Sequence, residues 1–381
     1  MRMVHRRTLG RVLAASLTAG LVGAVAQQPP FSEHILRKLH NESITGYALQ
    51  ERTLVTWGDR LLWRRLPEGN DQVVRGRGRA FAEGGCLLDV DGDGTLDIVV
   101  NEGGPESGLV WYRAPRSGAD WTRHVIGTGI DAPDMLPVTL LGHRGVLLIH
   151  KRAQVRFYEI PPNPTEPWPS QDVYSFYSPS HQGGLAMADI DSDGRPDILA
   201  GMYWIRSPES FDLPWRLFAI VLWNDTLDAA MLRSSYGPLT GPAPELVAAE
   251  RAVRPARIAR FEPPADPRQM WIEHPIDDVP DLAEVNSLEA ADFDGDGRPD
   301  LLVAEKSGRG RLLVLYNDGA GRFRPVVISA GQPTLFARAT DVNGDGRPDI
   351  LAIRPDAIVW FENRATSGKA PGKAPRPRSV P

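Results

Sequence analysis

An aspartate-rich pattern of nine residues occurs four times in this chain of 381 residues. The pattern is D-x-[DN]-x-D-G-x-x-D, and its copies begin at Asp89, Asp189, Asp292 and Asp341. Oxygen atoms at alternate positions can surround one hard cation, and Ca²⁺ takes about six to eight such ligands. Without a cation the carboxylates of each loop would repel one another. The loops predict up to four structural calcium ions, with simple Asp/Gly turns as the alternative.

Each loop offers side-chain oxygens at positions 1, 3, 5 and 9 and a backbone carbonyl at position 7. The predicted ligands are Asp89, Asp91, Asp93, Thr95 and Asp97; Asp189, Asp191, Asp193, Arg195 and Asp197; Asp292, Asp294, Asp296, Arg298 and Asp300; and Asp341, Asn343, Asp345, Arg347 and Asp349. Position 6 is glycine in every copy, as a sharp turn with a permissive backbone requires.

The residues around the loops argue against an EF-hand, although the first nine positions match one. Position 12 of an EF-hand is Glu, whereas it is Val or Ala in all four copies. The flanks, such as residues 84–88 and 97–100, are short apolar runs bounded by Gly and Asp, which predicts buried strands. We therefore expect a calcium-type loop within a β-hairpin.

The spacing of the loops indicates a repeat. Their first aspartates are separated by 100, 103 and 49 residues. The repeating unit is therefore about 50 residues long, and each of the two longer gaps contains one unit without the loop. A period of this size is typical of a propeller or a solenoid.

Two further markers follow the same period. A β-type run with an aromatic residue near its end occurs seven times, at residues 60–63, 109–112, 155–158, 203–204, 258–261, 313–316 and 358–361. A later run with the pattern aromatic-x-x-His/Phe-x-Ile/Leu starts at Trp121, Trp215 and Trp271, and also at Phe31, before the first unit. The last unit has no such run of its own, so residues 31–36 supply it and close the ring, which removes the exposed sheet edges. The sequence predicts an all-β fold, a seven-bladed β-propeller of four-stranded blades over residues 27–364, with loops in blades 2, 4, 6 and 7.

These loops resemble those of FG-GAP/VCBS repeat proteins, such as integrin-α propellers and many exported bacterial proteins. The resemblance covers roughly residues 31–364 and implies that each loop joins the first two strands of its blade and that calcium is structural. Blades 1, 3 and 5 lack the carboxylates, and we predict no metal there. The outer-strand pattern and the run from His181 to Gly194 also resemble the propeller of aldos-2-ulose dehydratases, which are sugar-modifying enzymes with metal sites.

The two ends of the chain differ from the repeat. Residues 1–26 are predicted to be a signal peptide, with a 14-residue apolar stretch, Val12–Val25, that is too short to span a bilayer, and an A-x-A site at residues 24–26. Its basic residues are Arg2, Arg6, Arg7 and Arg11. The protein is expected in the periplasm or outside the cell, by either the Sec or the twin-arginine route, and millimolar calcium there suits such loops. Residues 365–381 are predicted to be a disordered basic tail.

Composition narrows the classes of partner. The formal net charge is −5, and fifteen acidic side chains lie in the four loops, so the acidity belongs largely to the predicted metal sites. Nucleic-acid binding is not expected, nor is a transmembrane segment, and we expect a monomer. The one cysteine, Cys86, cannot form an intramolecular disulfide and is expected in the core.

Candidate chemical groups lie outside the loops. No nucleophile motif or phosphate-binding glycine loop is present. His34, His124 and His274 share one outer-strand position, which favours packing over catalysis. Counting eight residues back from the loop aspartate aligns His181 with Glu284, and this pair could act as acid and base or bind a second metal in a central funnel. The alternative is that both are ordinary rim residues.

Three neighbouring residues, Tyr203, Trp204 and Arg206, could offer sugar stacking and carboxylate binding at the rim. Two functions therefore remain open. The first is a ligand-binding module for a glycan or a protein. The second is a carbohydrate lyase, dehydratase or isomerase with its active site in the central funnel.

Overall fold

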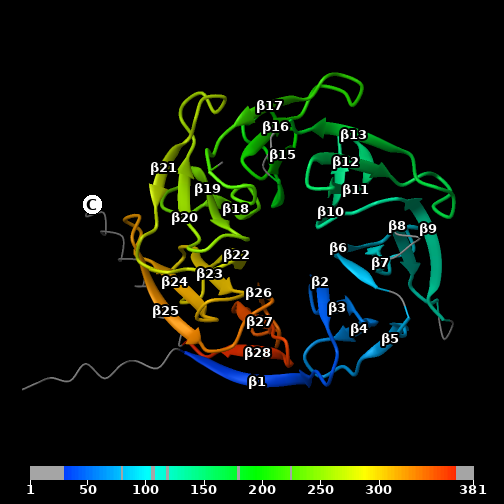
Figure 1. Ribbon diagram of the computed structural model, residues 1–381, viewed down its shortest axis with the longest axis horizontal. Helices are drawn as coiled ribbons and strands as arrows, with labels where there is room; N and C mark the ends of the chain where they lie inside the picture. Colours follow the sequence, from blue (N-terminus) through cyan, green and yellow to red (C-terminus); the bar gives the residue numbers. More distant parts are fainter. Residues whose placement is uncertain are drawn as a thin grey trace, which may run out of the picture.

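The chain folds into a closed ring of seven β-sheets (Figure 1). The computed structural model describes residues 30–365 except 79, 104–107, 117–119, 178–180 and 224. Within these residues all regular elements are strands, and the twenty-eight strands form seven antiparallel sheets of four. The predicted all-β, seven-bladed propeller is confirmed.

The first four blades follow one another in chain order. Blade 1 contains β2 (Ile44–Gln50), β3 (Thr53–Gly58), β4 (Leu61–Arg65) and β5 (Gln72–Arg75). Blade 2 contains β6 (Phe81–Leu88), β7 (Asp97–Glu102), β8 (Gly108–Arg113) and β9 (Thr122–Thr128). Blade 3 contains β10 (Asp134–Leu140), β11 (His143–His150), β12 (Gln154–Glu159) and β13 (Ser170–Ser175). Blade 4 contains β14 (Leu185–Ala188), β15 (Asp197–Ala200), β16 (Tyr203–Arg206) and β17 (Arg216–Ala219).

The last three blades complete the ring. Blade 5 contains β18 (Leu232–Pro238), β19 (Pro244–Glu250), β20 (Ile258–Glu262) and β21 (Ile272–Pro275). Blade 6 contains β22 (Val285–Ala291), β23 (Asp300–Glu305), β24 (Leu312–Asn317) and β25 (Phe323–Ser329). Blade 7 contains β26 (Phe336–Thr340), β27 (Asp349–Ile353), β28 (Ala357–Asn363) and β1 (Phe31–Lys38).

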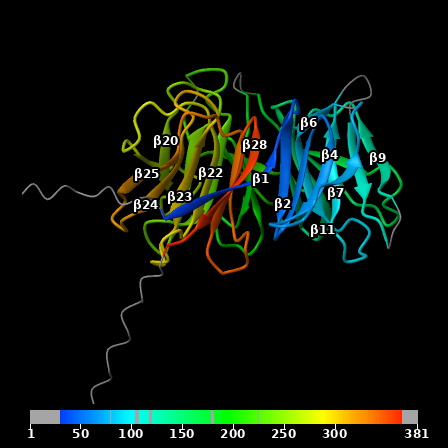
Figure 2. The same cartoon turned by 90° about the horizontal axis from the view of Figure 1, so that it is seen from below.

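The N-terminal strand closes the ring, as predicted. β1 pairs antiparallel with β28, from Phe31 opposite Asn363 to Lys38 opposite Ala357. It lies along the outer edge of blade 7 in Figure 1 and beside β28 in Figure 2. Phe31 also packs on Phe293 of blade 6, with ring centroids 5.9 Å apart. One segment therefore covers the edge of β28 and contacts the neighbouring blade.

The core is divided among the contacts between blades. Seven buried apolar clusters each combine residues of two neighbouring blades. In β7, Val99 packs toward blade 3 whereas Ile98 and Val100 pack toward blade 1. Successive side chains of a strand point to opposite faces, and both faces of a blade are covered here. Such strands therefore read as continuous apolar runs, and this explains the runs that follow each loop.

The outer strands place the repeated histidine against the third strand. His34 stacks on Trp360 and His124 on Trp111, with ring centroids 4.6 Å and 4.7 Å apart. His274 lies opposite Arg260 in register. Two of the three histidines therefore pack on a third-strand tryptophan, whereas Nε2 of His274 lies 3.1 Å from Glu262 Oε2.

The ring has two distinct ends. At one end the inner strands begin side by side: Gly84 N–H donates to Ala132 O across 3.0 Å between blades 2 and 3. At the other end lie the loops that join first and second strands, which we call the loop end. Among the described residues no helix is long and apolar enough to cross a membrane. The predicted signal peptide and the tail from residue 366 onward lie outside the described residues.

Candidate functional site

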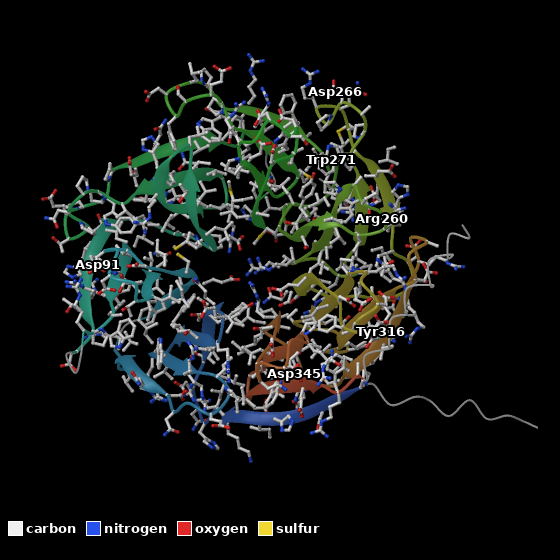
Figure 3. The ribbon with its side chains drawn as sticks, turned by 180° about the vertical axis from the view of Figure 1, so that it is seen from behind. Asp91, Arg260, Asp266, Trp271, Tyr316 and Asp345 are labelled. Carbon is white, nitrogen blue, oxygen red and sulfur yellow. The ribbon has the colours of Figure 1, made fainter. Side chains whose placement is uncertain are left out.

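The four aspartate loops connect the first and second strands of blades 2, 4, 6 and 7. They follow β6, β14, β22 and β26, in agreement with the predicted hairpins. Figure 3 shows Asp91 of the first loop and Asp345 of the fourth in separate blades of the ring. Each loop therefore has to be considered as a separate site.

The position 1 aspartate organises each turn. Asp89 Oδ1 accepts the N–H of Asp93 across 3.0 Å, and Oδ2 accepts the N–H of Gly94 across 2.9 Å. The same two bonds recur in the other three loops. Gly94 has φ of 85°, and a Cβ added there would meet no atom within 4 Å. Glycine is therefore needed for its backbone conformation rather than for space.

The position 9 aspartate joins the loop to the third strand. Asp97 is buried; its Oδ2 accepts the N–H of Val90 across 3.1 Å, and its Oδ1 accepts the N–H of Ala114, which follows β8, across 2.6 Å. The equivalent bonds occur in the other loops. Burial raises the pKa of Asp97 and Asp197 to about 6 and that of Asp300 to about 7. This carboxylate therefore ties three strands of the blade together even before any metal is considered.

The carboxylates at positions 1, 3 and 9 converge. In three loops one oxygen from each lies within 4.8 Å of the others. These groups are Asp89, Asp91 and Asp97; Asp189, Asp191 and Asp197; and Asp292, Asp294 and Asp300. Oδ1 of Asp91 and Oδ1 of Asp191 are buried and accept no hydrogen bond from any described residue. A buried acceptor without a partner costs about 1–3 kcal/mol. The donor set and these two oxygens fit a hard cation such as Ca²⁺.

The fourth loop has an amide where the others have a carboxylate. Asn343 Oδ1 accepts the N–H of Asp345 across 3.0 Å, and its Nδ2 donates to Asp345 Oδ2 across 3.1 Å. Burial raises the pKa of Asp349 above its ordinary value. This loop carries one negative charge less than the others, so it is expected to hold a cation more weakly.

Arginine side chains also contact the loop carboxylates. The sequence analysis did not predict these contacts. The side chains of Arg195, Arg298 and Arg347 at position 7 pair with the position 5 aspartate of their own loop. In the first loop, where position 7 is threonine, Arg116 pairs with Asp93 across 2.8 Å. These guanidinium groups offset part of the carboxylate repulsion. The sequence pattern predicts only a backbone carbonyl ligand at position 7 and does not predict these ion pairs.

The structure does not bring His181 and Glu284 into one site. His181 Nδ1 lies 2.8 Å from Asp228 Oδ1. Glu284 pairs with Arg254 across 2.7 Å, and its φ is 50°. His181 lies before β14 and Glu284 directly before β22, and neither belongs to the described residues that line the central cavity. Each side chain therefore has its own surface partner.

The three residues predicted to bind a ligand at the rim contact other parts of the protein instead. Tyr203 stacks on Phe176, with ring centroids 5.3 Å apart. Trp204 is fully buried, so it presents no face to a ligand in this structure. Arg206 pairs with Asp191 and with Asp193, the latter across 3.0 Å. Arg206 is thus part of the second aspartate loop.

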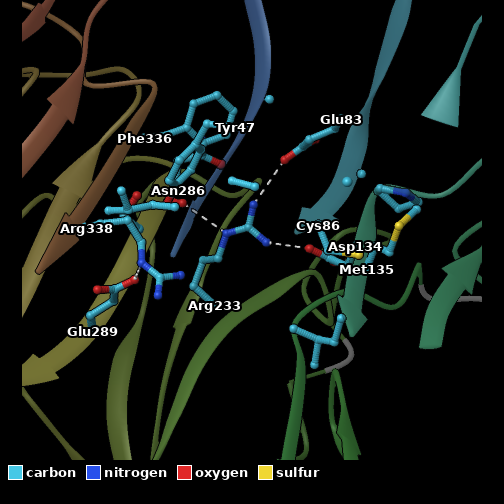
Figure 4. A pocket seen from close by; sticks show the side chains of 18 of the residues that line it. Tyr47, Glu83, Cys86, Asp134, Met135, Arg233, Asn286, Glu289, Phe336 and Arg338 are labelled. Atoms are coloured by element: carbon cyan, nitrogen blue, oxygen red, sulfur yellow. Dashed lines mark hydrogen bonds and ion pairs between the residues drawn. The ribbon is translucent and has the colours of Figure 1, made fainter. Parts of the chain in front are cut away.

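A polar cavity on the axis of the ring is the main site that the sequence analysis missed. It has a volume of about 400 Å³ and is lined by the inner strands of six blades (Figure 4). Arg233 of β18 reaches across it, with Nη1 2.9 Å from Asp134 Oδ1 and Nη2 3.1 Å from Glu83 Oε1. Its Nε donates to the carbonyl of Asn286 across 2.9 Å. One side chain of blade 5 thereby contacts blades 2, 3 and 6.

A second arginine completes this network. Arg251 is buried, pairs with Glu83 and donates through Nε to Asn286 Oδ1 across 3.0 Å. Burial alone would raise the pKa of Asp134, but the charges of Arg233 and Arg251 and a bond from the N–H of Gly184 outweigh it, so this pKa lies below its ordinary value. We call Glu83, Asp134, Arg233 and Arg251 the cross-channel network. It lies near the starts of the inner strands.

A second polar group lies farther along the axis, toward the loop end. Arg338 Nε is 2.8 Å from Glu289 Oε1, and Glu289 Oε2 accepts the N–H of Ala339 across 2.9 Å. The hydroxyl of Tyr47 lies beside Arg338, and the Tyr47 ring is 5.1 Å from that of Phe336. Burial raises the pKa of Glu289 above its ordinary value. This group combines donors, acceptors and aromatic rings.

A spacing rule could have located these cavity residues. Glu289 and Arg338 each stand three residues before the first aspartate of their loop, and Glu83 and Asn286 each stand six residues before it. The eight-residue count that selected His181 and Glu284 reaches the turn before the inner strand instead. Polar residues three or six positions before the loop are therefore the signal for the channel wall.

Comparisons with known proteins agree with this fold. Residues 292–352, which begin at the third loop and include the fourth, match the family model of the FG-GAP-like repeat. This confirms the FG-GAP resemblance, whereas the resemblance to aldos-2-ulose dehydratases stays a prediction. No curated protein sequence matches the chain.

Solved structures show the same architecture at low sequence identity. YCF48 from Cyanidioschyzon merolae aligns with a TM-score of 0.54 and 13% identity, covering 86% of this chain and 98% of that one. A structure of YCF48 bound to D1 peptide aligns with a TM-score of 0.51 and 11% identity, covering 88% and 97%. At this identity the likeness supports the fold alone.

Proposed function

We propose that this protein is an exported β-propeller, stabilised by structural calcium, that binds a glycan or protein ligand. The observation that carries the calcium proposal is the pair of buried carboxylate oxygens, Asp91 Oδ1 and Asp191 Oδ1, that lack a partner beside two other loop carboxylates. When bound, Ca²⁺ would supply a positive charge and oxygen coordination to each loop. The position 1 and position 9 bonds hold the loop in place for it.

The axial cavity supports the ligand-binding part. Binding sites for small molecules are commonly concave, about 300–1,000 Å³ in volume, with a few polar groups among apolar walls. The cavity of about 400 Å³ has this size and carries Tyr47, Glu289 and Arg338 among small and apolar side chains. The solved YCF48 propeller with a bound D1 peptide is a precedent for ligand binding by this fold.

Export is proposed from the first 26 residues. Their four arginines, the apolar stretch and the A-x-A site are the parts of a signal peptide. The carbohydrate-active alternative receives no support from a particular contact, because His181 and Glu284 are held by Asp228 and Arg254.

Calcium depletion tests the proposal. Purified residues 27–381 should lose thermal stability in excess EGTA, because an ion bound only by the folded state adds about 2.7 kcal/mol per site at one hundred times its Kd. The double variant Asp91→Ala, Asp191→Ala should bind two calcium ions fewer by elemental analysis. An unchanged melting temperature in EGTA, or an unchanged calcium content in the variant, would refute the metal assignment. A glycan array probed in millimolar CaCl₂ tests the ligand-binding part.

A further inference from the structure

The Arg338–Glu289 pair lies between two cavities rather than inside a packed core. The axial cavity of about 400 Å³ and a second one of about 480 Å³ share Ser234, Leu288, Glu289 and Arg338 in their walls. The second cavity also reaches Thr340, the last residue of β26, beside the fourth loop. Space for a ligand therefore exists on both sides of this pair and continues toward the loop end.

The opposite end of the channel is crossed by charged side chains. Arg233 spans from β18 to Glu83 and Asp134, and all three side chains are mostly buried. Their charges are already compensated within the cross-channel network, so they offer little to an incoming ligand. Access to the Arg338–Glu289 pair is therefore from the loop end.

Arg338 has donors available to a ligand. Its side chain is 46% exposed, its Nε is bonded to Glu289 (Figure 4), and both Arg338 and Tyr47 line the axial cavity. Glu289 supplies acceptors, since each carboxylate oxygen has two lone pairs. A hydroxyl group both donates and accepts hydrogen bonds. Neighbouring hydroxyl groups of one ligand could therefore accept from Arg338 and donate to Glu289.

The balance of charge selects against an ionic ligand. Three arginines (Arg233, Arg251 and Arg338) and three acids (Glu83, Asp134 and Glu289) lie in the channel wall or pair with it, so the formal charge of this set is zero. A buried charge without a partner is strongly unfavourable, and an ionic ligand would leave one. The Tyr47 ring, which lines the axial cavity, suits the C–H face of a ring compound.

We propose that the channel, at the Arg338–Glu289 pair and open toward the loop end, binds a neutral sugar unit, free or at the end of a glycan. This inference rests on the proposed ligand-binding function and selects the glycan among its ligands. Arg338 and Tyr47 donate to ring hydroxyls, Glu289 accepts from them, and the apolar wall contacts the face of the ring.

Saturation-transfer difference NMR on residues 27–381 in millimolar CaCl₂ tests this site. The probes are glucose, galactose, mannose, rhamnose and xylose, together with glucuronate and galacturonate. At least one neutral sugar should bind, and Arg338→Ala and Glu289→Gln should each weaken it about tenfold or more, as expected for lost hydrogen bonds to charged groups. Arg338→Lys keeps the positive charge and replaces the alanine variant in the binding test if Arg338→Ala fails to fold. Arg268→Ala, which removes an exposed pair with Asp266 far from the channel, should leave binding unchanged.

Several outcomes would overturn the channel site. Binding of uronates alone, no binding of any neutral sugar, or equal binding by wild type and Arg338→Ala would each do so. If a glycan or purified protein binds wild type and both channel variants equally, the ligand-binding function stands while the channel site fails. If no ligand binds and EGTA changes nothing, the proposed function fails as well.

Discussion

Replacing Arg233 by methionine should destabilise the propeller strongly, because this residue compensates two buried carboxylates at once. Its contacts with Asp134 at 2.9 Å and Glu83 at 3.1 Å would both be lost. Removing one partner of a buried ion pair costs about 3–5 kcal/mol, because it leaves an unpaired charge. We expect a loss of this size in the free energy of unfolding. Arg251 still pairs with Glu83, so Asp134 is the carboxylate that loses its ion-pair partner.

The loss should depend on pH in a defined direction. In the wild type the pKa of Asp134 is lowered in the folded state, so its ionised form stabilises the fold above the unfolded pKa of about 3.9, and this contribution disappears as the pH falls. Without Arg233, burial dominates and raises that pKa. The charged carboxylate then costs stability at pH 7, and protonation relieves this cost as the pH falls. The difference between wild type and variant should therefore be larger at pH 7 than at pH 5.

Urea unfolding at both pH values, followed by tryptophan fluorescence, measures this difference. Arg322→Met is the matched control, because Arg322 pairs with Asp318 across 2.8 Å but is highly exposed. Such surface pairs contribute about 0–1 kcal/mol. Equal losses in the two variants, or a deficit of Arg233→Met that does not change between pH 7 and pH 5, would refute the account of the cross-channel network.

Two further predictions concern the loops and the closure of the ring. Gly94→Ala should cost about 1–2 kcal/mol, because an L-residue is strained at φ of 85°, whereas Gly241→Ala, which is equally open and lacks a positive φ, should be nearly neutral in the same thermal scan. Equal effects would contradict the conformational argument. Deleting residues 27–39 should expose the edge of β28 and cause association, measured by size-exclusion chromatography with light scattering. A stable monomer would show that β1 is dispensable for closure.

The repeated parts of the sequence were sufficient to predict the fold. Copies of the loop and of the third-strand aromatic residue defined the period, and the outer-strand pattern at Phe31 predicted that β1 joins blade 7. The outer strands β5, β13 and β25 do not have this pattern, and they were not predicted individually. Their positions follow from the ring rather than from their own residues.

The channel could not be predicted in the same way, because it has no repeat. Glu83, Asp134, Arg233 and Arg251 come from three different blades, and each occurs once at its position. Their significance depends on the distance across the axis, which a period along the chain does not contain. The prediction for His181 and Glu284 used a correct alignment of blades but reached the turn before the inner strand.

The loops also brace the blades that lack them. Arg144 of blade 3 donates to the carbonyl of Asp89 in the first loop across 2.7 Å. Asn317 of blade 6, whose N–H is bonded to the position 9 aspartate of the third loop, donates through Nδ2 to the carbonyl of Leu239 in blade 5 across 2.7 Å. Thr340, directly before the fourth loop, donates to the carbonyl of Glu51 in blade 1 across 3.5 Å. Blades 1, 3 and 5 each lie between two blades with loops, so every blade without the aspartate loop has neighbours that carry it. Contacts from the blades that carry loops therefore reach all three blades that lack them, at the end from which a ligand would enter the channel.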